Sequence, residues 1–331
     1  MDPLNWAFAA SIAALLAVAT VAGRLLERQQ QLGLNRAAVE AFNSRLRAWL
    51  IIFCLLPVAF LSKGLTVAIF GVISFWALRE FITLTPTRLG DHRALFWVFF
   101  LFAPLQYLLV GLDNSAFRGG ADAVDAGRLD TYPFYSVMIP VFAFLFIPLR
   151  VAIAGDPRRF LERVAKIQSG LLVCVYCLSY APALLFLEAP MLESDDTVLL
   201  LLYFVTITLI GEASQVAWGR LYGRHVIAPQ INSSRTWEGL LGGSATTALF
   251  GMAFYGATPY TELWHAVLAS MLVAVMGCAG AVTMSAIKRD RGVKDYGTLI
   301  EGHGGVLDRI DALCFAAPVF YHVTRNLLGA T

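Results

Sequence analysis

Charged residues are scarce in this chain of 331 residues. Asp, Glu, Lys and Arg make up 15% of it, whereas soluble globular domains contain about 25%. Hydrophobic residues make up 58%, which indicates several membrane spans and not a single soluble core. The net charge is only +2, so no bulk basic surface favours nucleic acid as a partner.

Cysteines are also few, and all five lie within apolar runs. Cys174 and Cys177 form a CxxC pattern without a second pair, so we interpret them as small buried side chains and not as a zinc or redox site. The chain has no GxSxG, GxxxxGK[ST] or HExxH motif, which argues against α/β-hydrolase, P-loop and zinc-protease chemistry. The first apolar run lacks a basic start and a cleavage site, so we expect it to be a retained span.

Ten segments of the chain approach the length of roughly 20 apolar residues that a bilayer span requires. We therefore predict an all-α integral membrane protein with about ten transmembrane helices. An N-terminal region, 1–131, would contain about four spans and a polar loop at 24–47 that forms a surface helix. A C-terminal region, 132–331, would contain the chemistry, with motifs at 211–243 and 285–311. The predicted spans are 4–23, 48–62, 64–84, 94–111, 132–149, 168–187, 197–218, 238–256, 263–287 and 312–329.

Basic residues fall almost entirely on one side of this ten-span arrangement. With the loop after the first span placed inside, the inside segments contain 21 of the 25 Lys and Arg residues, and the outside segments contain 4. Cytoplasmic loops of membrane proteins are enriched in Lys and Arg. We therefore predict a multi-pass protein of the cell inner membrane, with both termini on the non-cytoplasmic side and an active site facing the cytoplasm.

The last inside segment, residues 285–311, is the strongest candidate for a functional site. Ser285, Lys288 and Arg289 share one face if the preceding span continues as a helix, and they combine a hydroxyl group with two cations. Glycines on both sides of His303 allow backbone N–H groups to approach a ligand closely. This combination is typical of a phosphate-binding site.

Carboxylates accompany these cations. Asp308 and Asp311 are three residues apart at the start of the last predicted span, so both face the same way. Mg²⁺ is commonly bound by one or two carboxylates together with substrate phosphates. Glu212 lies near the inner end of the seventh predicted span, and ionisable residues within spans usually face a polar cavity. The sequence therefore predicts a site for phosphate and a divalent cation at the membrane surface.

The inside loop at 218–243 adds cations and a carboxylate. We expect Gly242 and Gly243 to pack helices together and not to contact a ligand. Near the end of the third predicted span, we interpret Arg79 and Glu80 as a local ion pair. The charged residues of the loop are Arg220, Arg224, Arg235 and Glu238.

The long pattern at 285–311 resembles the signature of the phosphatidate cytidylyltransferases, also called CDP-diacylglycerol synthases. An upstream stretch that includes Pro229 resembles the second conserved block of that family, and the clear match covers about 211–320. The signature reads Ser285-x-x-Lys288-Arg289, Lys294-Asp295-x-Gly297 and His303-Gly304-Gly305-x-x-Asp308-Arg309-x-Asp311. The upstream block contains Gly219-Arg220, Gly223 and Thr236-Trp237-Glu238-Gly239.

The resemblance implies a reaction that joins CTP and phosphatidate, or a related phospholipid, to give CDP-diacylglycerol and pyrophosphate with Mg²⁺ as cofactor. We assign catalytic roles to Lys288, Arg289, Lys294, Asp295, His303, Asp308 and Arg309. We assign substrate binding to Ser285, Arg220, Arg235, Thr236, Glu238, Gly304 and Gly305, and metal binding to Asp308, Asp311 and Glu212. The other expected partners are membrane lipids and a second copy of the chain, with no nucleic acid.

Three single residues and one short stretch depart from the family pattern. Ala281 stands where the family has an acidic residue implicated in metal binding, and Glu212 stands where an Asp is expected. Glu301 replaces a Pro or Gly, and 232–235 replaces a Ser-Pro-x-Lys sequence. We therefore interpret the chain as a divergent paralogue.

Two alternatives stay open. One is a related CTP-dependent lipid or polyprenol kinase, and the other is a catalytically impaired family member with a binding or scaffolding role. A transporter is disfavoured, because the charges concentrate at one face of the membrane and not at its midplane.

Overall fold

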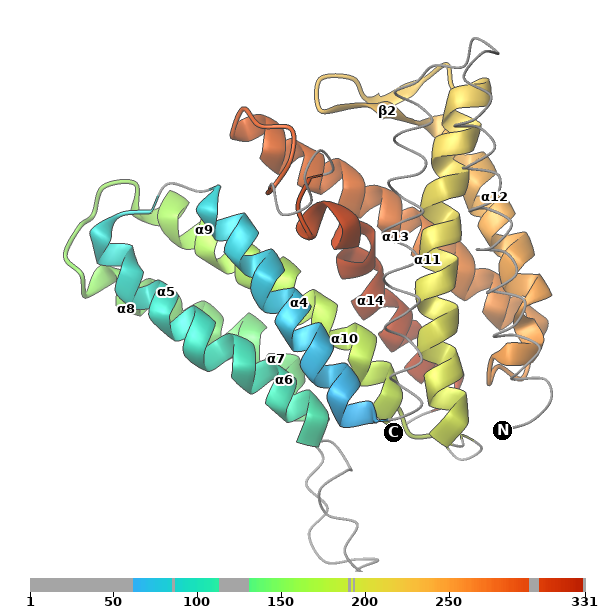
Figure 1. The fold of residues 1–331 in the computed structure, drawn as a ribbon, viewed down its shortest axis with the longest axis horizontal. Helices are drawn as coiled ribbons and strands as arrows, with labels where there is room; N and C mark the ends of the chain where they lie inside the picture. The colour runs from blue at the N-terminus through green and yellow to red at the C-terminus, as the bar shows by residue number, and fades with distance from the viewer. Residues whose placement is uncertain are drawn as a thin grey trace, which may run out of the picture.

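A computed structural model describes residues 62–84, 87–112, 131–189, 192, 194–297 and 304–329, and Figure 1 shows a bundle of long helices. The first two predicted spans, 4–23 and 48–62, and the polar loop at 24–47 lie outside the described residues, apart from Ser62. The hydroxyl of Ser62 caps α4 by accepting a hydrogen bond of 3.2 Å from the Leu65 N–H.

The first half of the described chain forms four membrane-length helices, three of them interrupted by π-helical turns. Helix α4 covers Lys63–Thr83. A short 3₁₀ turn at Leu89–Asp91 leads into α5, and another at Leu184–Phe186 follows α10. The interrupted helices are α5 (His92–Trp97) with α6 (Ala103–Leu112), α7 (Tyr132–Val137) with α8 (Phe144–Ala152), and α9 (Phe160–Leu171) with α10 (Leu178–Ala183); their π turns are Val98–Phe102, Met138–Ala143 and Leu172–Cys177.

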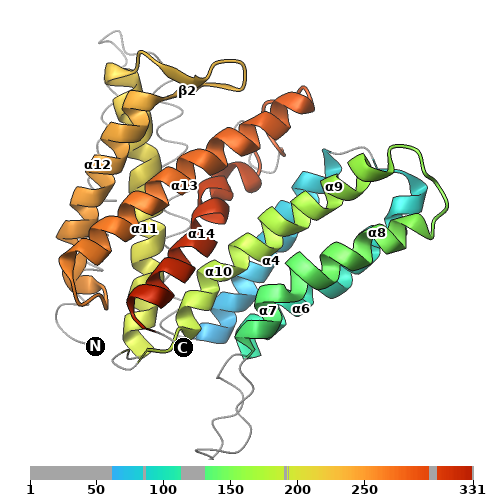
Figure 2. The same cartoon turned by 180° about the vertical axis from the view of Figure 1, so that it is seen from behind.

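The second half contains four helices that pack against one another (Figure 2). A Cβ on Gly242 would lie 2.6 Å from Trp218 Cδ2, and a Cβ on Gly243 would overlap Gln215. Since only glycine permits this approach, both residues pack α12 against α11, as the sequence predicted. The helices are α11 (Ser194–Tyr222), α12 (Trp237–Ala253), α13 (Leu263–Asp290) and α14 (Leu307–Leu327).

The helices agree closely with the predicted spans. Each predicted span from the third onward coincides with one helical segment, and six of these segments are long and apolar enough to cross a membrane. Helices α12 and α14 occupy the positions of two further predicted spans. The mostly helical architecture with several helices of membrane-spanning length is therefore confirmed, whereas the full count of ten spans and the orientation of the termini stay predictions. The six segments are Lys63–Thr83, His92–Leu112, Tyr132–Ala152, Phe160–Phe186, Asp195–Tyr222 and Leu263–Asp290.

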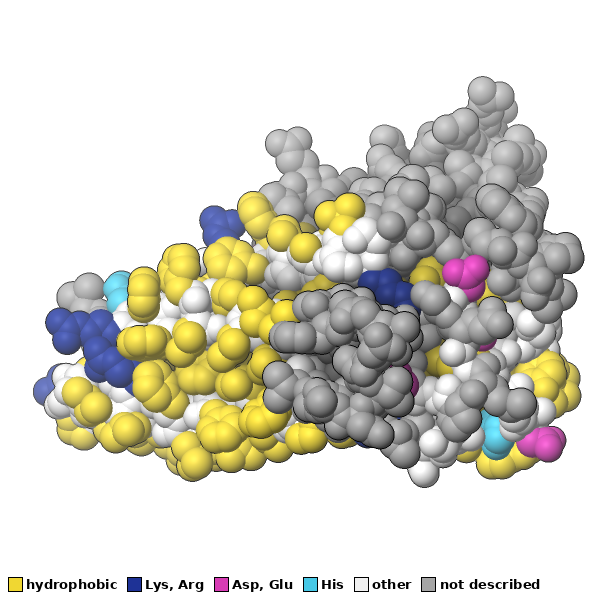
Figure 3. All heavy atoms as spheres, turned by 90° about the horizontal axis from the view of Figure 1, so that it is seen from below, with side chains coloured by type: hydrophobic (Ala, Val, Ile, Leu, Met, Phe, Trp, Pro, Cys, Tyr) yellow, Lys and Arg dark blue, Asp and Glu magenta, His cyan; other side chains and the backbone are white. Residues whose placement is uncertain are grey.

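Apolar side chains cover most of the left-hand part of the face shown in Figure 3, as expected for helices that face lipid. Val72 of α4, Phe100 next to α5, Leu145 of α8 and Leu241 of α12 are all exposed. Because this apolar surface is spread over helices from both halves of the chain, it supports membrane embedding of the bundle and not only of single helices.

One element departs from an all-α fold. Strands β1 (Val226–Ala228) and β2 (Asn232–Thr236) form a short antiparallel hairpin between α11 and α12. Figure 1 shows this hairpin at the same end of the bundle as the end of α13 and the start of α14. Among the described residues, the loops that were predicted to lie inside therefore gather at one end, while α4 and α11 begin at the other.

Candidate functional site

The first turn of α14 gathers the two ends of the 285–311 motif around the carboxylate of Asp308. Lys288 Nζ lies 2.8 Å from Asp308 Oδ1. The backbone N–H groups of Tyr296 and Gly305 donate to Asp308 Oδ2 over 2.8 and 2.9 Å. Asp308 thus joins the end of α13, the loop after it and the start of α14.

Gly304 fits this turn for two physical reasons. Its φ of +84° lies in the left-handed region that favours glycine. A Cβ at this position would also lie 2.9 Å from Asp308 Oδ2 and 3.3 Å from Asp295 Oδ1. Asp295 and Asp308 therefore both approach this turn, and Lys294 is exposed. Predicted residue His303 lies outside the described residues.

Lys288 is held between the Asp308 carboxylate and an aromatic face. Its Nζ lies 5.5 Å from the centre of the Tyr296 ring, within range for a cation–π contact. Tyr296 is buried, and its hydroxyl donates to the carbonyl of Met284 over 2.9 Å. The Lys288 side chain is only 17% exposed, so its charge faces a protein environment that strengthens electrostatic interactions.

The hairpin contacts the same part of α13. Asn232 Nδ2 donates to Ser285 Oγ over 2.9 Å, and Ser285 Oγ donates to the carbonyl of Ala281 over 2.6 Å. Arg289 Nε donates to the carbonyl of Ile231 over 3.3 Å. The two sequence motifs are therefore adjacent in space, although more than 50 residues separate Asn232 from Ser285.

A buried guanidinium forms the second centre of the site. Arg235 is only 6% exposed, and it donates to Gln215 Oε1 over 2.9 Å. Its other terminal nitrogen lies 3.6 Å from Glu212 Oε1. Gln215 is fixed in turn, because its amide donates to the carbonyl of Ala274 over 2.7 Å. Arg235 therefore links α11, α13 and the hairpin.

Asp311 connects the two centres. Its carboxyl group is buried in α14, and Oδ1 accepts from the Ala312 N–H over 2.7 Å. Glu212, Arg235 and Lys288 all interact electrostatically with it. Two cations and three carboxylates from α11, the hairpin, α13 and α14 thus form one cluster, which we name the charge cluster: Glu212, Arg235, Lys288, Asp308 and Asp311.

Other predicted site residues have structural contacts or lie at the edge. Thr236 Oγ1 caps α12 by accepting from the Gly239 N–H over 3.0 Å. The Glu238 carboxylate accepts from the backbone N–H groups of Arg224 and His225, and it also pairs with the His225 ring. Arg220 is exposed on the last turn of α11.

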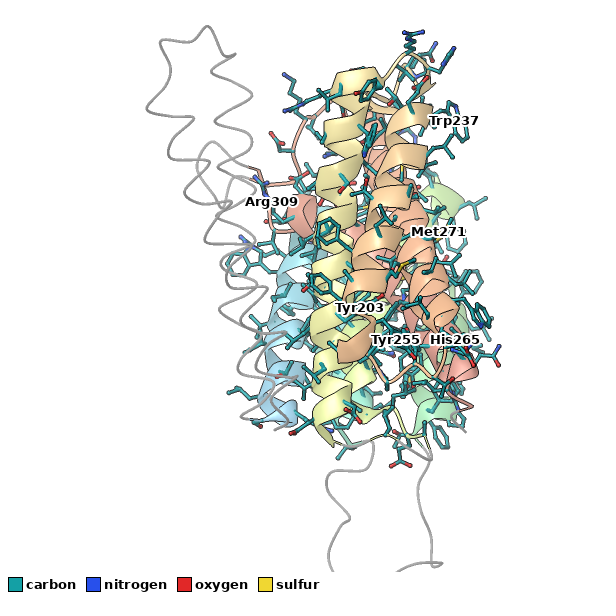
Figure 4. The ribbon with its side chains drawn as sticks, turned by 90° about the vertical axis from the view of Figure 1, so that its right-hand side faces the viewer. Tyr203, Trp237, Tyr255, His265, Met271 and Arg309 are labelled. Atoms are coloured by element: carbon teal, nitrogen blue, oxygen red, sulfur yellow. The ribbon has the colours of Figure 1, made fainter. Side chains whose placement is uncertain are left out.

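Figure 4 places Arg309 toward the hairpin end of the bundle, near the start of α14. Trp237 lies toward that same end at the start of α12, whereas Tyr255 and His265 lie toward the opposite end. Arg309 and Trp237, one from each motif, therefore lie toward the end of the bundle that carries the charge cluster.

The predicted metal ligands do not gather into a metal site by themselves. Within the described ranges, no group of three or more His, Cys, Asp or Glu side chains is arranged to hold a metal ion. Asp308 instead accepts hydrogen bonds from three protein donors, and Glu212 faces Arg235. Metal binding by Asp308, Asp311 and Glu212 stays a prediction.

Glu80 is a site residue that sequence reasoning missed. It is buried, and its two carboxylate oxygens accept from the N–H groups of Val306 and Leu307 over 2.9 Å each. The interpretation of Glu80 as one half of a local pair with Arg79 was wrong. The Arg79 guanidinium lies over the Trp76 ring at 5.2 Å. The sequence offered one indication of this contact. Glu80 is a carboxylate inside an apolar run, and such a carboxylate requires a polar or charged partner.

Comparisons with known proteins match most of the chain, including both motifs. The family model described as "Cytidylyltransferase family" matches residues 43–327. The uncharacterized protein YnbB of Escherichia coli (strain K12) is 34% identical over 317 residues, which cover 96% of this chain and 97% of YnbB.

Several phosphatidate cytidylyltransferases match over a shorter part of the chain. The enzyme of Thermotoga maritima is 32% identical over 190 residues, covering 53% of this chain and 64% of the enzyme. The enzyme of Haemophilus influenzae is 34% identical over 126 residues, covering 37% of this chain and 44% of the enzyme. The chain thus matches about half of the length of these enzymes, and it matches YnbB almost end to end.

Proposed function

The chain belongs to the cytidylyltransferase family, and we propose that it transfers the cytidylyl group of CTP to phosphatidate or a related lipid phosphate. The products are CDP-diacylglycerol, or its equivalent for another lipid, and pyrophosphate. The observation that carries this proposal is the charge cluster, in which Lys288 is held beside Asp308 at the glycine turn and Arg235 is held by Gln215 and Glu212. The end of the bundle that holds this cluster would face the cytoplasm, where CTP is present.

The reaction needs positioning and charge neutralisation more than proton transfer. An oxygen of the lipid phosphate attacks the α-phosphorus of CTP, a new P–O–P linkage forms, and the bond to the β-phosphate breaks so that pyrophosphate leaves. A phosphate monoester has a second pKa near 6, so the nucleophile is already largely ionised at pH 7. Cations placed at the phosphates lower the barrier by stabilising the charge of the transition state.

The described residues supply this chemistry as follows. Lys288, oriented by Asp308 and Tyr296, binds phosphate oxygens of CTP. Arg235, fixed by Gln215 and Glu212, presents its guanidinium to the second phosphate group. The exposed Lys294 holds the triphosphate, and the apolar helix surfaces keep the lipid chains in the membrane.

Mg²⁺ belongs to the proposal as a component of the reaction mixture, because it accompanies nucleoside triphosphates in phosphoryl-transfer reactions. The described acidic side chains do not form a complete metal site, since Asp308 is occupied by protein donors. We therefore assign no step of the reaction to a protein-bound metal. The dependence of turnover on Mg²⁺ is a quantity to be measured.

The test uses purified full-length protein in lipid nanodiscs with phosphatidate, Mg²⁺ and CTP labelled in either its α- or its γ-phosphate. Cytidylyl transfer moves the α-label into lipid, whereas a kinase moves the γ-label. We expect α-label in lipid and its loss in Asp308→Ala. The control Asp195→Ala removes an acid from the first turn of α11, at the opposite end of the bundle, and should keep activity.

Two outcomes would replace the proposal by an alternative. Transfer of the γ-label alone would identify a lipid kinase. Binding of CTP without transfer of either label to any phospholipid would identify a catalytically impaired member, for which Ala281 would offer a structural reason.

A further inference from the structure

A carboxylate from the N-terminal half of the chain is bound to the start of the helix that carries Asp308. Glu80 lies near the end of α4, and 226 residues separate it from Val306. Its two oxygens accept from two consecutive backbone N–H groups, those of Val306 and Leu307. The side chain is 5% exposed, so this contact is shielded from water.

The glycines around the turn are matched to this carboxylate. A Cβ on Gly305 would overlap Glu80, and all three of the nearest atoms that it would meet belong to that side chain. A Cβ on Gly297 would lie 2.8 Å from Glu80 Oε1. Two glycines of the motif therefore leave space for Glu80, which gives a physical reason for their presence that is separate from ligand binding.

Helix α4 makes a second contact with the same region. The ring of Phe81 stacks on the ring of Tyr296 with 6.2 Å between their centres. Tyr296 donates its N–H to Asp308, and its ring faces Lys288. Neighbouring residues of α4 thus contact the loop after α13 and the start of α14.

Three consecutive N–H groups of the turn are engaged by two carboxylates. The Gly305 N–H donates to Asp308, and the next two donate to Glu80. These N–H groups have no partner within the helix, because the first turn of any helix lacks preceding carbonyls. A carboxylate at this position also interacts favourably with the helix dipole. The contact therefore sets both the first residue of α14 and the direction of its first turn.

We propose that Glu80 is a positioning residue of the active site. Its carboxylate fixes the Gly304–Leu307 turn, so that Asp308 and Lys288 keep the geometry that phosphate binding requires. Glu80 itself does not touch substrate in this proposal. A displacement of about 1 Å in such a site can lower the rate about 100-fold, so loss of the contact should reduce turnover strongly without removing a binding group.

The kinetic test of this proposal rests on the proposed function. A structural measurement tests the role of Glu80 separately from the transferase activity. Glu80→Gln keeps the size of the side chain but places an amide NH₂ group against backbone N–H donors. We expect kcat to fall by about 10- to 100-fold, with a change of less than about threefold in the KM for CTP. Glu262→Gln is the matched control, because Glu262 is exposed and makes no capping hydrogen bond at the start of α13.

Hydrogen exchange of the full-length protein in nanodiscs provides the structural readout. We expect faster exchange at the amides of Val306 and Leu307 in Glu80→Gln, with other helices unchanged. Unchanged exchange at these two amides would overturn the proposal even if the protein is an active transferase. Absence of transfer in the wild-type protein would instead overturn the proposed function and leave the exchange result interpretable.

A pair of substitutions keeps the proposal testable if Glu80→Gln folds poorly. Gly305→Ala should lower the melting temperature strongly in the wild-type background, because the added methyl group meets the Glu80 carboxylate. The same substitution should cost much less in a Glu80→Ala background, where that space is free. Equal costs in both backgrounds would show that Glu80 does not occupy the space beside Gly305, and would overturn the proposal.

Discussion

Lys288 Nζ lies 2.8 Å from Asp308 Oδ1, at the junction between the end of α13 and the start of α14. The two side chains are 17% and 9% exposed. The pair is therefore partly shielded from solvent, and each partner depends on the other for compensation of its charge. Its geometry explains why the signature contains a cation and an acid separated by 20 residues.

Substitution of one partner should be worse for stability than substitution of both. Asp308→Asn leaves the Lys288 ammonium without its counter-charge, and breaking such a pair costs about 3 kcal/mol when it is buried. Lys288→Met should also destabilise, while the double variant should cost less than the sum of the two. Thermal unfolding in detergent measures all three. Additive costs would mean that the two charges do not interact.

Arg235 should not be replaceable by lysine in this chain, although a lysine stands at this position in the family pattern that the sequence resembles. Its guanidinium reaches Gln215 and Glu212 with separate nitrogens, whereas a lysine ammonium is a single point charge on a flexible chain. We expect Arg235→Lys to lose at least about 10-fold in kcat/KM, a free-energy change of about 1.4 kcal/mol. Arg93→Lys is the control, since Arg93 is exposed near the start of α5. Wild-type activity in Arg235→Lys would contradict a specific role for the guanidinium.

The helices could be predicted from the sequence because burial in lipid requires long apolar runs. The segment Leu263–Asp290, for example, differs from its predicted span by three residues at one end. The sequence also predicted that the loops containing Ser285 and Asn232 share one side of the membrane, but it did not predict the contact between these two side chains. The hairpin at 226–236 could not be predicted, because its strands have three and five residues and show no hydrophobic alternation.

The role of Glu80 could not be predicted either, for a different reason. Its partners are backbone N–H groups 226 and 227 residues away, and no local pattern encodes such a contact. Only the presence of a carboxylate within an apolar helix signalled that some partner must exist. Contacts of this kind can be found only from the tertiary structure, because the separation of two residues along the sequence does not show which helix ends lie close together in space.

A surface ion pair should make the loops at the site end of the bundle sensitive to acid. The hydrogen bond from Arg88, together with the N–H of Arg158, holds the pKa of Asp156 below its usual value of 3.8. A depressed pKa stabilises the folded state above the usual value, and this contribution disappears as the pH falls through the folded pKa. Asp156→Asn should therefore melt below the wild type at pH 7, with a difference that begins to shrink near pH 4 and vanishes once the pH is below the lowered pKa of the folded state. A difference that persists at low pH would contradict this assignment.

The distribution of basic residues predicts the orientation of the chain. The end of α14 lies at the opposite end of the bundle from the hairpin and the charge cluster (Figures 1 and 2). If the basic loops face the cytoplasm, a reporter that works only in the periplasm should be active when it is fused after Thr331. A reporter that works only in the cytoplasm should be silent at the same position. The reverse result would overturn the predicted topology. Insertion of the same two reporters at Pro229, in the turn of the hairpin, provides the complementary test. There the cytoplasmic reporter should be active and the periplasmic reporter silent.

Ala281 offers a direct test of metal use. It is 4% exposed in α13, and the adjacent Gly280 lies against α14, where a Cβ would be 2.8 Å from the carbonyl oxygen of Asp311. Ala281→Asp would add a carboxylate beside the charge cluster, which already contains Glu212 and Asp311. Without a divalent cation, the added buried charge should lower the melting temperature, because burial and like charges both oppose it.

Addition of Mg²⁺ should reverse this loss in Ala281→Asp. A cation present at about 100 times its Kd stabilises the folded state by about 2.7 kcal/mol, so we expect Mg²⁺ to raise the melting temperature of this variant more than that of the wild type. Ala281→Asn is the matched control, since it has nearly the same size and no charge. An equal response of both variants to Mg²⁺ would show that position 281 does not contribute to a metal site. A larger response in Ala281→Asp, accompanied by a higher rate of cytidylyl transfer, would show that the acid missing at this position limits the wild-type protein.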